Sequence, residues 1–248
     1  MIASRYLDRV TEILGEIRAL ELPRLEELAG QIADALSSGG LFYVYDNGHM
    51  LNTELFNRAG GLALLAPIEL GRPRLGTAAV RPGGEPAAVP VSVDDDLTLA
   101  RMAVRRAGVK AGDVVLLGSV SGRSPLVVEL AEESARRGAL TVGLTALRYS
   151  TTLPASHPSG RRLYEAVAVV LDTHTGIGDA EVAVDGLAER VLPSSGISAA
   201  LVAWCLIAAL IEALLERGVE PTVFRSINYP DGPERHAAAL ERYRRLGY

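Results

Sequence analysis

Short apolar runs alternate along the chain with longer segments whose apolar residues recur every three or four positions. The short runs are rich in β-branched residues, which is typical of strands buried on both faces of a parallel sheet. They predict strands at residues 41–45, 62–70, 114–117, 140–145 and 167–171. The longer segments predict helices at residues 4–36 with a break at Pro23, 49–59, 94–107, 125–137 and 159–166.

Strands that alternate with helices in this way are joined by right-handed crossovers and lie parallel. We therefore predict an α/β fold, a doubly wound three-layer αβα sandwich with a five-stranded parallel sheet. The predicted sheet and its helices fill residues 38–192 of a single domain, 1–248, with helical segments at 1–37 and 193–248. If the strand order is 2-1-3-4-5, a ligand is expected where the first and third strands end side by side.

The two ends of the chain are helical, and one helix is apolar on nearly every side. Residues 197–211 form an apolar run that ends at Glu212 and is too short to span a bilayer comfortably. We expect this helix, which ends before Gly218, to lie at the centre of a subunit interface. The N-terminal helices are expected to pack on a neighbouring copy, which predicts a homodimer or homotetramer. Residues 234–246 predict a final basic amphipathic helix.

Composition narrows the possible partners. A net charge of −5 over 248 residues argues against a nucleic-acid-binding surface, so an anionic ligand would need a local pocket of donors. Cys205 is the only cysteine, which excludes an intrachain disulfide and fits a reducing cytoplasm. The N-terminus lacks an apolar signal core. We expect a cytoplasmic protein that binds neither nucleic acid nor membrane.

The most informative stretch follows the strand at residues 114–117. Gly118 to Ser124 is a turn of glycine and hydroxyl residues, and Pro125 then opens a helix. Free amides and the positive end of a helix dipole make such a turn suitable for an anion. The turn lacks the Lys of a Walker loop and the spacing of a dinucleotide fingerprint. The alternative is a serine-rich turn that merely caps its helix.

Ser119-Val-Ser-Gly-Arg-Ser124 resembles the phosphate loop of the SIS (sugar isomerase) domain, Ser-x-Ser-Gly-x-Ser/Thr. Three further blocks resemble a bacterial SIS subfamily that is similar to phosphoheptose isomerase, at residues 48–62, 157–165 and 178–180. The blocks follow one another in the order of that subfamily. The resemblance implies a flavodoxin-like SIS fold and a phosphorylated sugar as ligand.

The resemblance also implies roles for single residues. The phosphate would be held by Ser119, Ser121, Gly122, Arg123 and Ser124, and the sugar would lie near Asn47, Gly48, Ser194 and Ser195. Capping of the apolar helix is a sufficient alternative explanation for the last two serines. A solvated surface side chain is as good an explanation for Arg123.

Three residues are candidates for catalysis, namely Glu54, His49 and His157. Glu54 matches an active-site glutamate of phosphoheptose isomerase-like proteins, although an ion pair with Arg58 four residues on is the alternative. His157 falls in a matching block and ranks above His174, which follows Asp172 beyond the fifth strand.

A metal is not expected. Zinc in the relative is held by His and Glu four residues apart, whereas His49 and Glu54 are five apart, roughly 140° around a helix. The subfamily's usual Gly-His-Ser-His-Met is replaced here by Asp46-Asn-Gly-His-Met50. We expect neither a metal nor another cofactor.

These residues favour an aldose–ketose isomerase or epimerase of a sugar phosphate. His49 or His157 would open the ring, and Glu54 would move a proton between adjacent carbons. Two alternatives remain open. One is a phosphosugar-binding sensor without turnover, and the other is a related lyase or etherase that uses the same pocket.

Overall fold

The computed structural model describes residues 1–48, 50–51, 54–70 and 92–248. Its centre is a parallel sheet of five strands in the order β2-β1-β3-β4-β5, the order on which the expected ligand position depends and which the resemblance implies. The strands are β1 (Phe42–Asp46), β2 (Leu65–Pro67), β3 (Val114–Gly118), β4 (Leu140–Thr145) and β5 (Val169–Asp172). Strand β2 is added on one side of β1, and β3 and the later strands are added on the other side. The parallel strands β1 and β3 are therefore neighbours that end side by side, with Asp46 opposite Gly118.

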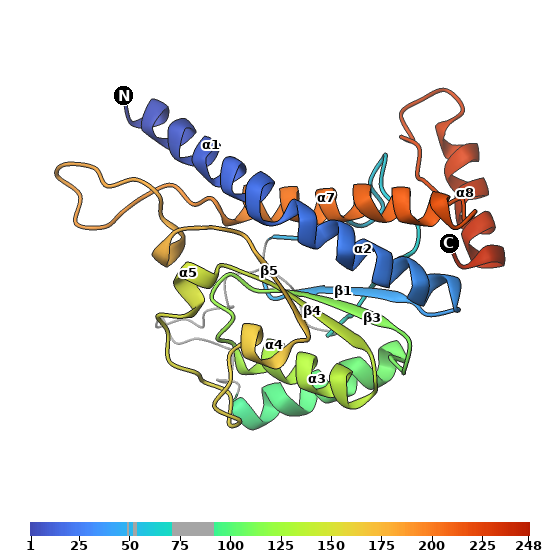
Figure 1. Cartoon of the computed structure of the whole chain (residues 1–248), viewed down its shortest axis with the longest axis horizontal. Helices are drawn as coiled ribbons and strands as arrows, with labels where there is room; N and C mark the ends of the chain where they lie inside the picture. Colours follow the sequence, from blue (N-terminus) through green and yellow to red (C-terminus); the bar gives the residue numbers. More distant parts are fainter. Residues whose placement is uncertain (49, 52–53, 71–91) are drawn as a thin grey trace, which may run out of the picture.

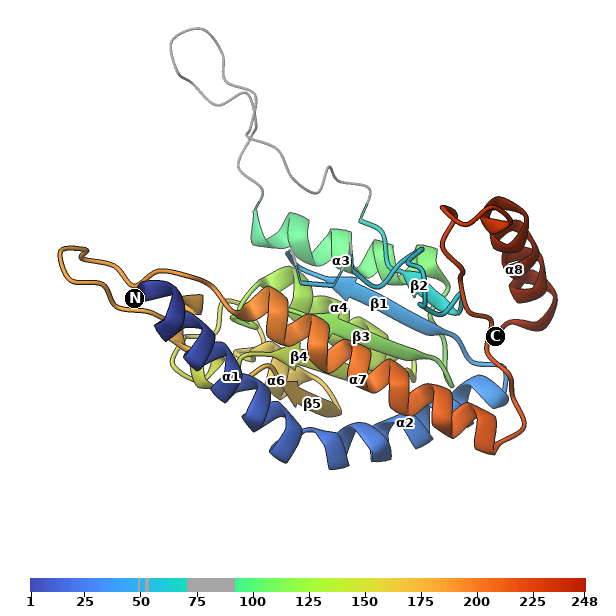
Figure 2. The same ribbon diagram turned by 90° about the horizontal axis from the view of Figure 1, so that it is seen from above.

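Helices cover both faces of the sheet (Figure 1). On one face lie α1 (Ile2–Leu20), α2 (Leu22–Ser37) and α7 (Ser195–Glu216), and on the other lie α3 (Val93–Ala107) and α4 (Pro125–Arg136). Figure 2 shows α7 running across the sheet beside α1 and α2. Shorter helices α5 (Leu147–Ser150), α6 (Leu163–Ala166) and η1 (Ile177–Asp179) connect the later strands, and α8 (Gly232–Leu246) ends the chain. This confirms the predicted three-layer sandwich.

The central strands are buried on both faces, and their side chains divide the core in two. Phe42 and Val44 of β1 pack with the α1, α2 and α7 layer, whereas Tyr43 and Tyr45 pack with the α3 and α4 layer. Alternate residues of β3 divide in the same way. Continuous apolar runs therefore fit strands that have helices on each side.

Local signals fix several helix ends. Ser92 caps α3 through a capping box with Asp95, and acidic residues fill the first turn. Pro125 occupies the first turn of α4, and Gly218 after α7 has a φ of +72°, as expected for a glycine that ends a helix.

One predicted helix is wrong. The described residues within 49–59 lie in turns and bends. The amides of Met50 and Leu51 donate to the Asp46 carboxylate at 2.7 and 3.0 Å, and Asn57 has a φ of +51°. Side-chain bonding to the backbone has replaced helical bonding there. The predicted surface loop at 71–90 lies outside the described residues.

Helix α7 spans 22 residues and extends beyond the predicted apolar run at both ends. Among the described helices it alone is long and apolar enough to cross a membrane. Val202, Leu206 and Leu210 belong to the core that it shares with α2 and the sheet. Packing of α7 against the core therefore accounts for an apolar composition that would also suit a membrane-spanning helix.

Two segments project from this body. Residues 182–191 form an arm that is closed by a bridge between Val182 and Val191. The arm lies against the N-terminal half of α1, where Arg5 donates to the carbonyl oxygen of Ala183. The other segment is α8, which stands apart from the sheet at one end of the molecule (Figure 2).

Candidate functional site

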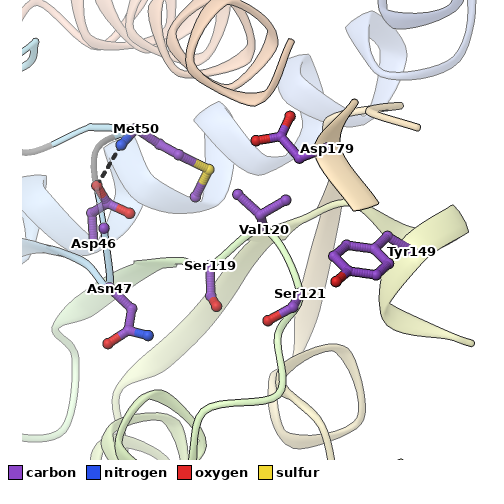
Figure 3. Close-up of a pocket in the computed structure, with 9 residues that line it drawn as sticks. Asp46, Asn47, Met50, Ser119, Val120, Ser121, Tyr149 and Asp179 are labelled. Carbon is purple, nitrogen blue, oxygen red and sulfur yellow. Dashed lines mark hydrogen bonds between the residues drawn. The ribbon is translucent and has the colours of Figure 1, made fainter. Parts of the chain in front are cut away.

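A cleft of about 320 Å³ opens where β1 and β3 end, at the expected edge of the sheet. Its described lining comes from four segments that are distant in sequence (Figure 3). The lining residues are Asp46, Asn47, Gly48, Met50, Ser119, Val120, Ser121, Tyr149 and Asp179. The volume falls at the lower end of the range for small-molecule sites.

Ser119 and Ser121 supply hydroxyl groups to this cleft. The Ser119 Oγ accepts from the amide of Gly122 at 3.2 Å, and the Ser121 Oγ accepts from the amide of Arg123 at 3.4 Å. Each hydroxyl therefore keeps its own proton to donate, and neither has an acceptor among the described residues. Figure 3 shows the two hydroxyls pointing to the same side of the loop. The amides of Gly122 and Arg123, which we expected to hold a phosphate, are used within the loop.

The loop is held rigidly from behind. The Val120 carbonyl oxygen accepts from the Thr145 Oγ1 and the Ala146 amide, both at 3.0 Å. The Gly122 carbonyl oxygen accepts from the amide of Leu163 at 2.8 Å. Gly122 has a φ of +59°, and a Cβ there would lie 2.9 Å from the Ser150 Oγ. Both the backbone conformation and the space therefore require glycine.

The rest of the predicted phosphate loop lies outside the cleft lining. Ser124 is the N-cap residue of α4, but its side chain makes no capping hydrogen bond. Arg123 is exposed and makes no ion pair within the described part of the chain. The positive end of the α4 dipole nevertheless lies directly after the two serines that line the cleft.

The turn after β1 forms the facing wall. The Asp46 carboxylate bonds to the amides of Met50 and Leu51 and so fixes the turn. The Asn47 amide nitrogen of the backbone donates to the Gly118 carbonyl oxygen at 2.9 Å, which ties the turn to the end of β3. The Asn47 Oδ1 accepts from the Tyr45 hydroxyl at 3.2 Å. The side-chain amide nitrogen of Asn47 is left as a donor toward a ligand.

Tyr149 and Asp179 complete the cleft; neither was expected as a site residue, although Asp179 lies in the matching block at residues 178–180. Tyr149 lies on α5, whose first amide, from Leu147, donates to the Asp172 Oδ1 at 3.0 Å. Asp179 follows β5 and accepts from the amides of Ser194 and Ser195 at 3.1 and 3.0 Å. Both residues follow the carboxyl ends of strands β4 and β5, and that position was the signal that could have found them.

A family model for the SIS domain matches residues 5–146 of this sequence. The chain belongs to the SIS-domain family. Relatives named UPF0309 proteins match almost the whole SIS-domain chain. One from Halalkalibacterium halodurans is 30% identical over 247 residues, 99% of this chain and 95% of the relative. One from Shouchella clausii is 31% identical over 245 residues, 96% of this chain and 97% of the relative.

Solved structures that resemble this SIS domain have lower sequence identity to it than these relatives do. A phosphoheptose isomerase from Francisella tularensis overlaps with a TM-score of 0.48 and 18% identity, over 85% of this chain and 96% of that one. A phosphoheptose isomerase from Neisseria gonorrhoeae gives a TM-score of 0.48 and 17% identity, over 86% and 97%. Overlaps of this size are too weak to transfer a residue's role to this SIS domain.

Ser194 and Ser195, expected near the sugar, are bonded to two carboxylates, Glu181 and Asp179, of which Asp179 lines the cleft. The Ser194 Oγ donates to Glu181 and the Ser195 Oγ donates to Asp179, both at 2.6 Å. Glu181 also accepts from the Arg9 Nε of α1 at 3.0 Å. Burial raises the pKa of Glu181, but its hydrogen bonds outweigh burial and hold the pKa below its ordinary value.

Glu54 does not line the cleft. Its carboxylate accepts from the Trp204 Nε1 of α7 at 3.1 Å and pairs with Arg58 at 2.8 Å. The ion pair is the one that the four-residue spacing suggested, and the indole is a second partner. His49, the other candidate in this turn, lies outside the described residues.

His157 is buried away from the cleft lining. Its Nε2 lies 2.9 Å from the Glu129 Oε2, and its Nδ1 lies 2.7 Å from the Ser159 Oγ. Glu129 is also paired with Arg101 at 2.8 Å and Arg136 at 2.5 Å. Burial raises the pKa of Glu129, but the hydrogen bonds from these partners lower it below its ordinary value.

Glu129 and His157, with Glu132, are grouped closely enough to bind a metal, since their ligand atoms lie within 4.8 Å of one another. However, the guanidinium groups of Arg101 and Arg136 already neutralise Glu129. A divalent cation would have to displace them. We therefore interpret the group as an ionic network that joins α3, α4 and the loop after α5.

His174 occupies a similar network beside β5. Its Nε2 lies 3.2 Å from Glu21, and its Nδ1 lies 3.5 Å from Glu16 and 3.6 Å from Asp172. The hydrogen bond to Glu21 and the surrounding carboxylates raise the pKa of His174, although burial opposes the change. The network joins α1 and α2 to the end of β5 and does not reach the cleft lining.

Proposed function

We propose that this SIS domain binds a phosphorylated sugar in the cleft and isomerises or epimerises it. The observation that carries the proposal is the pair of serine hydroxyls, Ser119 and Ser121, presented into the cleft between the end of β3 and the start of α4. A fully ionised phosphate group carries hydrogen-bond acceptors and no donors, so its binding site must supply the donors. Hydroxyls, the Asn47 side chain and the α4 dipole supply them.

The described lining holds no Lys or Arg. The donors are neutral, so we expect the phosphate to be held by directed hydrogen bonds more than by net charge. This arrangement suits a small metabolite that must be released again. A cleft of about 320 Å³ leaves room for a short carbon chain or ring beyond the phosphate.

Isomerisation requires a base that reaches two adjacent carbons and a group that polarises the carbonyl. We propose Glu54 as that base and His49 or His157 as the group that opens the sugar ring. Glu54 and His157 would each have to leave the partners described above to reach a sugar in the cleft. The base removes a proton from one carbon and returns it to the next, while a hydroxyl proton moves from one of the two adjacent oxygens to the other, so the reaction needs no other reactant. A base of this kind exchanges its proton with solvent between the two steps.

A second candidate function is a phosphosugar sensor without turnover. It is favoured by the contacts of Glu54 with Trp204 and Arg58, and of His157 with Glu129, which occupy both candidates elsewhere. The two functions differ in one measurement. The protein is incubated with a panel of sugar phosphates in deuterated water, and carbon-bound deuterium is measured by NMR. Incorporation supports the isomerase, whereas binding without incorporation supports the sensor.

The phosphate site is tested by replacing Ser119 and Ser121 together with Ala. We expect affinity for inorganic phosphate and for sugar phosphates, measured by titration calorimetry, to fall at least tenfold because two donors are removed. The matched control is Ser37→Ala with Ser38→Ala, which changes two exposed serines at the end of α2. Equal affinity in the wild type and the cleft variant would remove the phosphate site.

We further propose that a second copy of the chain packs on α7. The outward residues of this helix recur at intervals of four and three and form an apolar stripe, which consists of Ile197, Leu201, Trp204, Ala208, Ile211 and Leu215. Ile197 and Leu215 are 48% and 54% exposed. Such spacing suits packing against another helix. A homodimer with this stripe at its centre is therefore the proposed assembly.

A further inference from the structure

Asp179 is a carboxylate of the cleft that is anchored to helix α7. Its Oδ1 accepts from the amides of Ser194 and Ser195, and its Oδ2 accepts from the Ser195 hydroxyl at 2.6 Å. These donors belong to the first turn of α7, so a 22-residue helix fixes the position of the carboxylate. An ionised carboxylate has about four acceptor positions, and three are used here. Because the residue lines the cleft and no other described residue bonds to its carboxylate, a fourth is left for a ligand.

The backbone at Asp179 is unusual. Its φ is +53°, and the preceding Gly178 has a φ of +77°. Residues other than glycine seldom adopt this conformation, although Asp tolerates it better than most. Two successive left-handed residues bring the side chain back over the cleft while it remains bonded to α7. Strained residues of this kind concentrate at binding and catalytic sites.

A carboxylate in a cleft that binds an anion affects which ligands the cleft can hold. It repels a phosphate, and its partial desolvation by a ligand is unfavourable unless the ligand provides donors. Figure 3 shows Asp179 on the opposite side of Val120 from the Ser119 hydroxyl. Asp46, the other carboxylate of the lining, is bonded to the amides of Met50 and Leu51. The cleft thus offers donors to one end of a ligand and the Asp179 acceptor to the other. A ligand that fits both is anionic at one end and carries hydroxyl groups at the other.

We infer that Asp179 is the residue that selects the sugar portion of the ligand, by accepting a hydrogen bond from one of its hydroxyls. The inference rests on the proposed phosphosugar function and extends it, because it assigns recognition of the two ends to different parts of the cleft. Serines of the loop bind the phosphate, and Asp179 distinguishes a phosphorylated polyhydroxy compound from phosphate alone.

The test is Asp179→Asn in the full chain. Asn keeps the shape, tolerates a positive φ and retains an Oδ1 that accepts from the amides of Ser194 and Ser195, so the variant is expected to fold. The probes are inorganic phosphate and a panel of glucose, fructose and mannose 6-phosphates and ribose 5-phosphate. We expect affinity for the tightest sugar phosphate of the panel to fall at least tenfold, as for loss of one hydrogen bond to a charged acceptor. Affinity for inorganic phosphate should be unchanged or increased, because a repelling charge is removed.

The matched control is Glu181→Gln. Glu181 lies two residues from Asp179 and bonds to the same end of α7, but it does not line the cleft. Equal losses of sugar-phosphate affinity in both variants would mean that the segment matters only structurally, and would overturn the inference. The inference would also be overturned if the wild type bound every sugar phosphate of the panel no more tightly than inorganic phosphate. A wild type that binds neither probe would instead overturn the proposed function itself.

Discussion

Replacing Gly122 with Ala tests how strictly the serine loop depends on its shape. An added Cβ would lie 2.9 Å from the Ser150 Oγ, 3.1 Å from the Thr145 Oγ1 and 3.3 Å from the Leu163 Cβ. The Thr145 hydroxyl is bonded to the Val120 carbonyl oxygen and cannot retreat without breaking that bond. The loop itself must therefore move, and Ser121 moves with it.

The magnitude follows from two contributions. An Ala in the left-handed region costs roughly 1–2 kcal/mol, of which about 0.4–1 kcal/mol is offset by the lower entropy of the unfolded chain. Overpacking of a filled site adds about 1–3 kcal/mol. We expect Gly122→Ala to lower the free energy of unfolding by about 2–4 kcal/mol, and the displaced loop to bind phosphate at least tenfold more weakly.

Gly160 provides the control, because its φ is +73° and an added Cβ there would meet nothing within 4 Å. Gly160→Ala should therefore show the backbone contribution alone, about 1 kcal/mol, with normal phosphate affinity. Urea denaturation gives the stability of both variants, and titration calorimetry with inorganic phosphate gives their affinity.

A double variant tests whether the loss of stability in Gly122→Ala comes from crowding of the added Cβ against Ser150. The Ser150 Oγ is buried and has no hydrogen-bond partner in the described part of the chain, so Ser150→Ala alone should be nearly neutral. Combined with Gly122→Ala, it should restore about 1 kcal/mol, which is a coupling expected only of residues in contact. Equal stability of the Gly122 and Gly160 variants, together with no coupling to Ser150, would refute the reasoning.

Two further predictions concern stability and assembly. His174 has a pKa raised above its ordinary value of 6.5, so its contribution to stability should be complete below that pH and be lost as the pH rises through the raised value. Urea denaturation between pH 5.5 and 8.5 should show this slope in the wild type and a smaller one in His174→Asn; identical slopes would contradict it. Ile197→Glu with Leu215→Glu should reduce the molar mass measured by light scattering to that of one chain, because charges would interrupt the apolar stripe. Met102→Glu, an exposed position on α3 in the opposite layer, should leave the mass unchanged, and an unchanged mass in the α7 variant would exclude the stripe as the interface.

The sheet and most helices could be predicted because their signals are local. The β-branched run at Val114, the capping pair Ser92 and Asp95, and the glycine after α7 each act within a few residues. The helix predicted from residue 49 failed because Asp46, a residue of the preceding strand, takes two of its amides. A side chain that bonds to the backbone leaves little trace in hydrophobic periodicity.

The site was only partly predictable because its contacts join distant positions. The serine loop is continuous in sequence, so its motif identified it. Glu54 bonds to Trp204 across 150 positions, and His157 bonds to Glu129 across 28. Asp179 bonds to Ser195 across 16. A position after the end of a strand makes such a carboxylate a candidate, but it does not tell whether the side chain lines the cleft or is bonded behind it.

Trp204 is the single tryptophan of the chain, and it lies in the apolar stripe of α7 with its indole bonded to Glu54. Intrinsic fluorescence excited at the red edge of protein absorption therefore originates from one place. Association of two copies through α7, or any movement of Glu54, alters the polarity around that indole and shifts its emission. The protein thus contains its own optical reporter, by which assembly can be followed at nanomolar concentration without a label.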